Sequence, residues 1–352
     1  MIGIDISDRS IKVAEVTGSQ ESPHLRTVCW DPLDASLIRG GVIQDVDMVA
    51  NALLASFDKC SPVSINNQMA VASIPENQSF VRVIDLPAMD DSEVDEAVSW
   101  AVRQHIPFDL DRMYLDWEPV PVSASGSSRR QVLVGAVQKE VVDPLLEVLD
   151  TAGVQVVALE LEAQAIVRAL LPRDAGGVEG VLVLDLGANA TNIIFFDQGI
   201  MRFTTSIERG GDDLTKQLVD ELHIQPSQAA EVKALVGLKS DVVSNDFDRI
   251  AVKSLHDATI SLLDSVKTVV QELSAQQQHE NFVRAILLSG GSASMPGLRE
   301  LVAEVFPNIP VQRGNPWTNI YLESSDNKAP LSAQDASHFV TALGLALRQE
   351  EV

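Results

Sequence analysis

One pattern occurs twice in this chain, roughly one domain-length apart. Residues 2–15 and residues 181–196 each hold an apolar segment that ends in an aspartate (Asp5 or Asp185), then a turn of small residues, then a second apolar segment. A tight hairpin of this kind points several backbone N–H groups into one concavity, which suits a phosphate chain. The aspartate at the strand end can hold the water shell of Mg²⁺, because this ion takes few protein ligands. The repeat therefore predicts two similar halves that close on a nucleotide from opposite sides.

Composition narrows the classes of partner. The chain has 352 residues, 45% hydrophobic and 22% charged, which is ordinary for a globular protein and long enough for two domains or one bilobed unit. The formal net charge of −24 is not ordinary. An acidic surface of this size favours solubility and repels nucleic acid and anionic lipid headgroups. We therefore expect neither as a direct partner.

Targeting and metal-binding signals are also sparse. A strand pattern begins at Met1, so we expect no signal peptide, and no apolar run has the length of a membrane span. Residues 345–352 lack the basic amphipathic character of a lipid anchor, so a partner would have to bring the protein to a membrane. Cys29 and Cys60 are not in a C-x-x-C motif, which favours a reducing compartment and indicates neither a disulfide nor a zinc site. The six histidines show no metal-ligand spacing.

The periodicity of apolar residues predicts an α/β protein with two lobes. A segment with β-α-β-β-α character interrupts the first lobe, and its Trp100 and Trp117 are expected to be core aromatics; the alternative is that one of them lines a peptide groove. A long helix is expected over residues 245–281. The predicted parts are the first lobe core at 1–75 and 153–175, the insertion at 76–152, the second lobe core at 178–211 and 284–336, a helical subdomain at 212–283, and a terminal helix at 337–352 that returns toward the first lobe.

A third motif follows the second hairpin. A strand near residues 285–288 runs into Gly290-Gly291, and a helix is expected to begin at about Pro296. Two glycines without Cβ atoms let the backbone lie flat against a ring or a sugar, and a helix N-terminus favours phosphate oxygens. A lone Gly-Gly pair is usually a plain turn. After a strand, and about 105 residues beyond Asp185, it is a stronger indication of a nucleotide site.

The order of hairpin, hairpin and Gly-Gly turn resembles the actin/Hsp70-like ATPase superfamily. Within it the chain is similar to the PilM family, actin-like cytoplasmic components of type IV pilus assembly related to the division protein FtsA. The similarity covers nearly the whole chain and implies a two-lobed actin-like fold with an FtsA-type insertion subdomain. The segments that carry it are Phe80-Val81-Arg82-Val83, Leu86-Pro87, residues 101–108, Asp116-Trp117, Met295-Pro296-Gly297-Leu298 and residues 341–348.

The resemblance assigns roles to individual residues. It implies ATP or ADP as the nucleotide, with Mg²⁺ held through water by Asp5 and Asp185. On the helix expected to carry Glu160 and Glu162, Glu162 is the candidate that positions the attacking water; the alternative is an acid favoured by the helix dipole. The implied nucleotide contacts are Asp5, Ser10 and Lys12 in the first hairpin, Asp185, Gly187 and Thr191 in the second, Gly290, Gly291 and Ser292 along the adenosine, and Gly210, Gly211, Asp212, Glu231 and Lys233 over ribose and base.

Two residues depart from the family pattern. Ser7 stands where the family has a glycine, so the backbone would approach the phosphates less closely, although the serine hydroxyl can contribute a hydrogen bond. If Lys233 is in register, Ala230 occupies the position of the ribose-contacting glutamate, and Glu231 is displaced by one residue. Both departures weaken the expectation of hydrolysis more than that of the fold, and we expect slow turnover at most.

The resemblance also implies a partner. In the PilM family the insertion subdomain and first lobe form a groove for the N-terminal cytoplasmic peptide of the inner-membrane protein PilN. This predicts an ATP-binding scaffold at the cytoplasmic face of the inner membrane. Binding of other pilus assembly proteins and formation of oligomers are compatible with this prediction. One alternative is a polymerising protein like FtsA, which should end in a basic lipid-binding helix, whereas this chain ends in acidic residues. A sugar kinase is a weaker alternative, because no polar sugar-binding cluster is evident.

Overall fold

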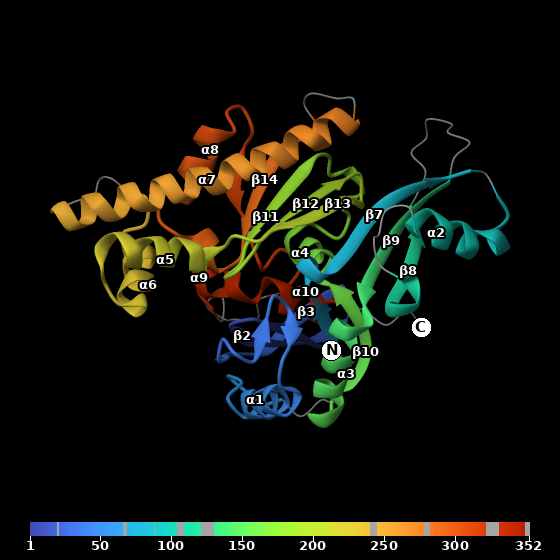
Figure 1. Ribbon diagram of the computed structural model, residues 1–352. Helices are drawn as coiled ribbons and strands as arrows, with labels where there is room; N and C mark the ends of the chain where they lie inside the picture. The colour runs from blue at the N-terminus through green and yellow to red at the C-terminus, as the bar shows by residue number, and fades with distance from the viewer. Residues whose placement is uncertain are drawn as a thin grey trace. The chain divides into compact units, whose positions relative to one another are not determined.

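The computed structural model describes residues 1–19, 21–65, 69–87, 89–103, 109–120, 130–239, 245–277, 282–321 and 331–348 (Figure 1). The chain divides into two compact units. The first unit comprises residues 1–169, 200–205 and 341–352, and the second comprises residues 170–199 and 206–340. The hairpin that contains Asp5 lies in the first unit, and the hairpin that contains Asp185 lies in the second.

A five-stranded sheet with the order β10-β6-β1-β2-β3 forms the centre of the first unit. Strand β1 pairs antiparallel with β2 and parallel with β6, and β10 pairs parallel with β6. The elements are β1 (Ile2–Ser7), β2 (Ser10–Ser19), β3 (Ser22–Pro32), the short pair β4 (Ile38–Arg39) and β5 (Val42–Ile43), α1 (Val46–Asp58), β6 (Met69–Ile74), α3 (Lys139–Thr151), β10 (Gln155–Leu161), α4 (Glu162–Leu170) and α10 (Val340–Ala346).

The two faces of this sheet follow from strand alternation. Ile2 and Ile4 of β1 are fully buried in one core cluster, together with residues of α1 and α3. Gly3, which points to the other face, lies directly against α10, where a Cβ atom would meet the carbonyl oxygen of Ala342. On that face Leu345 of α10 packs against Ala165 of α4 in a second cluster. Helices therefore cover both faces, and the residues near the chain end close one of them.

The insertion contributes three neighbouring strands, in the order β7-β9-β8, to one end of an eight-stranded sheet. Strand β13 also pairs with β7, with Phe203 opposite Arg82. Helix α2 buries Val94, Val98 and Val102 completely against the sheet, as its spacing of four residues predicts. The elements are β7 (Ser79–Leu86), α2 (Val94–Arg103), β8 (Met113–Pro119), β9 (Arg130–Gln138) and β13 (Ile200–Ile207).

The second unit repeats the local pairing around its own hairpin. Strand β11 pairs antiparallel with β12 and parallel with β14, as β1 does with β2 and β6. Helix α7 is the long orange helix in Figure 1 and packs along α5. The elements are β11 (Val181–Leu186), β12 (Thr191–Asp197), α5 (Gly211–Leu222), α6 (Pro226–Leu235), α7 (Asp246–Gln277), β14 (Ala285–Ser289), α8 (Leu298–Val305), β15 (Val311–Arg313) and α9 (Ala333–Ala336).

Several expectations need correction. Trp100 is 69% exposed on α2 and not a core residue, whereas Trp117 packs on the insertion core and donates its indole N–H to Asp95 at 2.8 Å. Glu160 lies at the end of β10 rather than on a helix, and its buried carboxylate binds the guanidinium of Arg168. Helix α8 begins at Leu298, two residues after Pro296, because the intervening Gly297 has a φ of +82°.

Boundaries differ as well. Residues 200–205 cluster with the first unit rather than the second because β13 pairs with β7. The second unit begins at residue 170, before the predicted boundary between residues 175 and 178. The end of the long helix expected to reach residue 281, and the chain end at 349–352, lie outside the described residues. Within the described residues, no helix has the length and apolar character needed to cross a membrane.

The two cysteines are paired, contrary to the expectation drawn from their sequence context. Cys29 lies in β3 and Cys60 follows α1, and the structure joins them in a disulfide. Their neighbours Val28 and Ser61 bond to each other through both backbone groups, at 3.2 and 3.0 Å. This backbone bridge brings the two sulfur atoms together. The sequence gives no local signal of it, because the cysteines are 31 residues apart.

Candidate functional site

In the first hairpin, strand register brings a cation and an anion together. Asp5 of β1 lies opposite Lys12 of β2, and paired residues of antiparallel strands share one face of the sheet. The Lys12 ammonium donates to the Asp5 carboxylate at 2.9 Å, and both side chains are largely buried, with exposed fractions of 15% and 5%. The hydroxyl of Ser73, from the neighbouring β6, donates to the other Asp5 oxygen at 3.4 Å. Asp5 therefore holds the Lys12 side chain in place within the hairpin.

Ser7 closes the tip of this hairpin. Its hydroxyl donates to the Ser10 carbonyl at 3.1 Å and lies 3.5 Å from the Lys12 ammonium nitrogen. Ser10 itself is buried. The serine thus uses its hydroxyl within the hairpin and places Lys12 at the tip, where the ammonium group can serve as a phosphate ligand.

Asp8, in the turn of the same hairpin, was not singled out from the sequence. Its two carboxylate oxygens accept hydrogen bonds from the backbone N–H groups of Gly40 and Gly41, both at 2.8 Å. These glycines link β4 to β5. The carboxylate therefore fixes the hairpin tip to a loop more than thirty residues away, a contact that local sequence patterns do not indicate.

The second hairpin is closed by backbone contacts. The N–H of Gly187 donates to the Ala190 carbonyl at 3.0 Å, and the buried hydroxyl of Thr191 donates to the Arg209 carbonyl at 2.8 Å. The first amides of α5 then dock on the hairpin: Gly211 N–H donates to the Gly187 carbonyl at 2.9 Å, and Asp212 N–H donates to the Ala188 carbonyl at 2.8 Å. The start of α5 is thereby fixed to the turn that follows Asp185.

This docking requires Gly210, and Gly211 lies close to two side chains from other segments. A Cβ atom on Gly210 would overlap the Ala188 carbonyl, and one on Gly211 would overlap the Ser292 hydroxyl. The Lys233 ammonium, reaching from α6, donates to the Gly211 carbonyl at 2.6 Å. Burial lowers the pKa of Lys233, and the nearby Asp212 carboxylate opposes this shift. Gly211 is thus the point at which Lys233 and Ser292, from two other segments, converge.

The Gly-Gly turn after β14 lies next to Gly211, because Ser292 follows this turn directly. Gly290 has a φ of +84°, and its backbone rests on that of Leu186, where a Cβ atom would lie 2.6 Å from the Leu186 carbonyl oxygen. Ser289, the residue before it, is paired in register with Asp185 on the parallel strand β11. The Ser289 hydroxyl is buried and has no hydrogen-bond partner among the residues that the structure describes. Gly210, Gly211, Gly290, Gly291 and Ser292, with the Lys233 ammonium, form what we call the glycine wall.

The sequence model of a known family, type IV pilus assembly protein PilM, matches residues 3–350 of this chain. The chain belongs to the PilM family. A curated relative, the cell division protein FtsA of Staphylococcus epidermidis, is 23% identical over 341 residues, which cover 86% of this chain and 72% of FtsA. This agrees with the relation to FtsA that the insertion predicts.

Solved structures support the same fold. The PilM-PilN type IV pilus biogenesis complex contains a chain that matches this PilM-family protein with a TM-score of 0.82 at 24% identity, covering 98% of this chain and 97% of that one. MreB5 of Spiroplasma citri bound to AMPPNP matches with a TM-score of 0.56 at 13% identity, covering 97% and 93%. The prediction of an actin-like ATPase fold is confirmed.

Glu162 is the first residue of α4, at the carboxyl end of β10. Its carboxylate accepts the backbone N–H of Glu76 at 3.4 Å, while the N–H of Ala163 donates to the Glu76 carboxylate at 3.3 Å. Glu76 is buried and also accepts the Thr204 hydroxyl at 2.7 Å. This reciprocal pair holds Glu162 at the helix N-terminus, where the dipole favours a carboxylate. No local sequence pattern indicates Glu76, because its partners lie 86 and 128 residues away.

Glu231 stands apart from the glycine wall. It is exposed on α6, two residues from Lys233, and residues two apart on a helix point in different directions. Ala230, three residues before Lys233, shares its face and has no polar atom on its side chain. The structure therefore brings Lys233 to the glycine wall and leaves Glu231 outside it.

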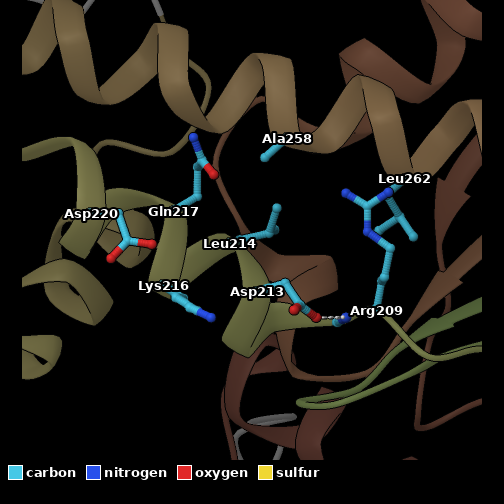
Figure 2. A pocket seen from close by; sticks show the side chains of 9 residues that line it. Arg209, Asp213, Leu214, Lys216, Gln217, Asp220, Ala258 and Leu262 are labelled. Carbon is cyan, nitrogen blue, oxygen red and sulfur yellow. Dashed lines mark hydrogen bonds between the residues drawn. The ribbon is translucent and has the colours of Figure 1, made fainter.

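A pocket of about 260 Å³ lies between α5 and α7, beside the glycine wall (Figure 2). Figure 2 shows charged side chains of both signs around Leu214, with Ala258 and Leu262 contributed by α7. The Arg209 guanidinium also donates to the Ser261 hydroxyl at 3.0 Å. Gly210 is the one predicted site residue that lines it; the lining residues are Arg209, Gly210, Asp213, Leu214, Lys216, Gln217, Asp220, Ala258 and Leu262.

The buried pair in the first hairpin predicts a stability difference. Asp5→Asn leaves the Lys12 ammonium without its charged partner in a mostly buried place, and we expect the free energy of unfolding to fall by about 2 kcal/mol. Glu140→Gln is the matched control, because the Arg112–Glu140 pair is exposed, and should cost under about 0.5 kcal/mol. Urea denaturation followed by circular dichroism measures both; equal losses would contradict a structural role for the buried pair.

Proposed function

We propose that this PilM-family protein is an ATP-binding or ADP-binding scaffold of type IV pilus assembly. The observation that carries the nucleotide part is the glycine wall, where glycines, a hydroxyl and a desolvated ammonium group converge. Bare backbone and a cation suit a nucleotide. The buried Ser289 hydroxyl beside Asp185 offers one further polar atom. MreB5, which shares the fold, is a protein bound to AMPPNP in its solved structure.

The two hairpins have different tasks in this proposal. In the first, Lys12 supplies the cation for phosphate oxygens, and Asp5 positions it. In the second, the turn at Gly187 and the first amides of α5 hold the backbone against the ligand. Mg²⁺ would be held by water and phosphate oxygens near Asp185 and Asp5, because it keeps most of its water shell. Among the described residues, no group of three or more His, Cys, Asp or Glu side chains is arranged to hold a metal by itself.

Turnover is the weaker part of the proposal. Glu162 is the candidate for positioning an attacking water, and its link to Glu76 would fix its orientation. Asp5 already binds Lys12, and Ala230 contributes no polar group beside Lys233. These features favour holding the nucleotide over hydrolysing it quickly. We therefore propose slow hydrolysis at most.

We propose that the partner is the N-terminal cytoplasmic peptide of a PilN-like inner-membrane protein, which would keep this chain at the inner membrane. The support is the likeness to a chain of the PilM-PilN complex. Edge strands in the first unit include β10 and β8. An extended peptide can add to such an edge through main-chain hydrogen bonds, with side-chain pockets giving specificity.

Assembly into FtsA-like filaments is the second candidate, favoured by the similarity to FtsA over most of this chain. A pelleting assay with Mg·ATP separates the two functions. Filaments that form without the PilN-like peptide would favour the polymerising role. No observation on the described residues favours a sugar kinase.

The glycine wall predicts a loss of nucleotide binding on adding a single methyl group. Gly211→Ala places a Cβ atom against the Ser292 hydroxyl and 3.1 Å from the Lys233 nitrogen, so we expect at least a tenfold weaker affinity for ADP in calorimetry. Gly177→Ala is the control, because a Cβ there meets nothing within 4 Å. Unchanged affinity in Gly211→Ala would show that the nucleotide does not use this wall.

Peptide binding tests the scaffold role separately. We expect a synthetic peptide with the PilN N-terminal sequence to bind the full chain with a micromolar or tighter dissociation constant in at least one nucleotide state. A scrambled peptide of the same composition is the control. Fluorescence anisotropy without nucleotide, with Mg·ADP and with Mg·ATP measures the affinity. No binding in all three states would contradict the partner, whatever the outcome for nucleotide.

A further inference from the structure

His338 lies at the end of the glycine wall, and no motif of the sequence assigns it a role. It belongs to the short 3₁₀ turn Ser337–Phe339 that leads into α10. A Cβ atom on Gly291 would be 2.8 Å from the His338 Cε1 atom, 3.0 Å from Nδ1 and 3.9 Å from Nε2. The Cε1–Nδ1 edge of the imidazole thus rests on the glycine, with Nε2 further away. Any larger residue at position 291 would displace this ring.

The position of His338 is also open to solvent. His338 is exposed, whereas its neighbours Phe339 and Val340 are buried and fix the backbone that carries it. The contact with Gly291 therefore fixes one edge of the ring, in a residue that is exposed as a whole. A planar ring presented in this way can receive another planar ring.

The remaining groups of the glycine wall give the direction along which a nucleotide would lie. Lys233 binds the Gly211 carbonyl, and the Ser292 hydroxyl lies against the same glycine. The Gly290–Gly291 turn follows, and the His338 ring closes the row. The row begins with a cation beside the α5 N-terminus, which suits phosphate or ribose oxygens. It ends with an aromatic ring, which suits a base.

We infer that His338 contacts the base of the bound nucleotide by stacking its imidazole on the purine ring, and so favours purine over pyrimidine nucleotides. This inference rests on the proposed nucleotide binding. Stacking of a base on an aromatic side chain contributes substantially to affinity and depends on ring overlap. A purine has two fused rings and therefore overlaps the imidazole more than a pyrimidine does.

Calorimetric titration of the full chain with Mg·ADP and Mg·CDP tests the contact. We expect His338→Ala to bind ADP about tenfold more weakly than wild type and to lose most of the preference for ADP over CDP. His338→Phe, which keeps a flat ring, should stay within about threefold of wild type. His256→Ala is the matched control, because His256 is an exposed histidine on α7. Circular dichroism checks that each variant is folded.

The contrary outcomes are distinct. Wild-type affinity for ADP in His338→Ala, with binding intact in wild type, would overturn the inference and leave the proposed function standing. An equal loss in His338→Phe and His338→Ala would overturn stacking as the nature of the contact. Failure of the wild-type protein to bind either nucleotide would overturn the proposed function, and this inference with it.

Discussion

Direct contact of backbone against backbone, permitted by glycine, is the constraint on which both units depend. In the first unit Gly3 lets α10 lie on β1, and Gly344 of α10 rests on the Ala165 carbonyl. In the second unit Gly210 and Gly290 bring the start of α5 and the turn after β14 onto the second hairpin. A Cβ atom at any of these positions would overlap backbone atoms that cannot move independently. Glycines in close contact with backbone atoms therefore serve both the packing of helices on the sheet and the construction of the candidate site.

The two hairpins share a topology and differ in chemistry. Each Asp-bearing strand lies between an antiparallel and a parallel neighbour, and the residue opposite the aspartate on the antiparallel strand is Lys12 for Asp5 and Asn192 for Asp185. The first hairpin contains an ion pair between Asp5 and Lys12, and the Ser7 hydroxyl lies beside this pair at the tip. The second hairpin relies on backbone groups and on the docking of α5. The two hairpins therefore offer different groups to a ligand, a cation in the first and backbone groups in the second.

Local patterns account for what the sequence predicts well. Asp45 caps α1 by accepting the Met48 N–H at 3.0 Å, and the spacing of Val94, Val98 and Val102 predicts the buried face of α2. The glycines of the site are visible as motifs. Contacts between distant segments are not: Asp8 with the β4–β5 loop, Glu76 with Thr204, Cys29 with Cys60, and His338 with Gly291. Whether Trp100 is buried also depends on tertiary packing. Its hydrophobicity alone predicts a core position, and that prediction is wrong.

The central claim is that both Asp-bearing hairpins bind the nucleotide. Its most direct test is the affinity of Mg·ADP for the wild-type protein beside Asp5→Asn and Asp185→Asn, measured by calorimetry at a temperature where all three are folded. The account predicts that each substitution weakens binding at least tenfold, the first by releasing Lys12 and the second by removing the carboxylate next to Mg²⁺. Equal affinity in all three proteins would contradict it.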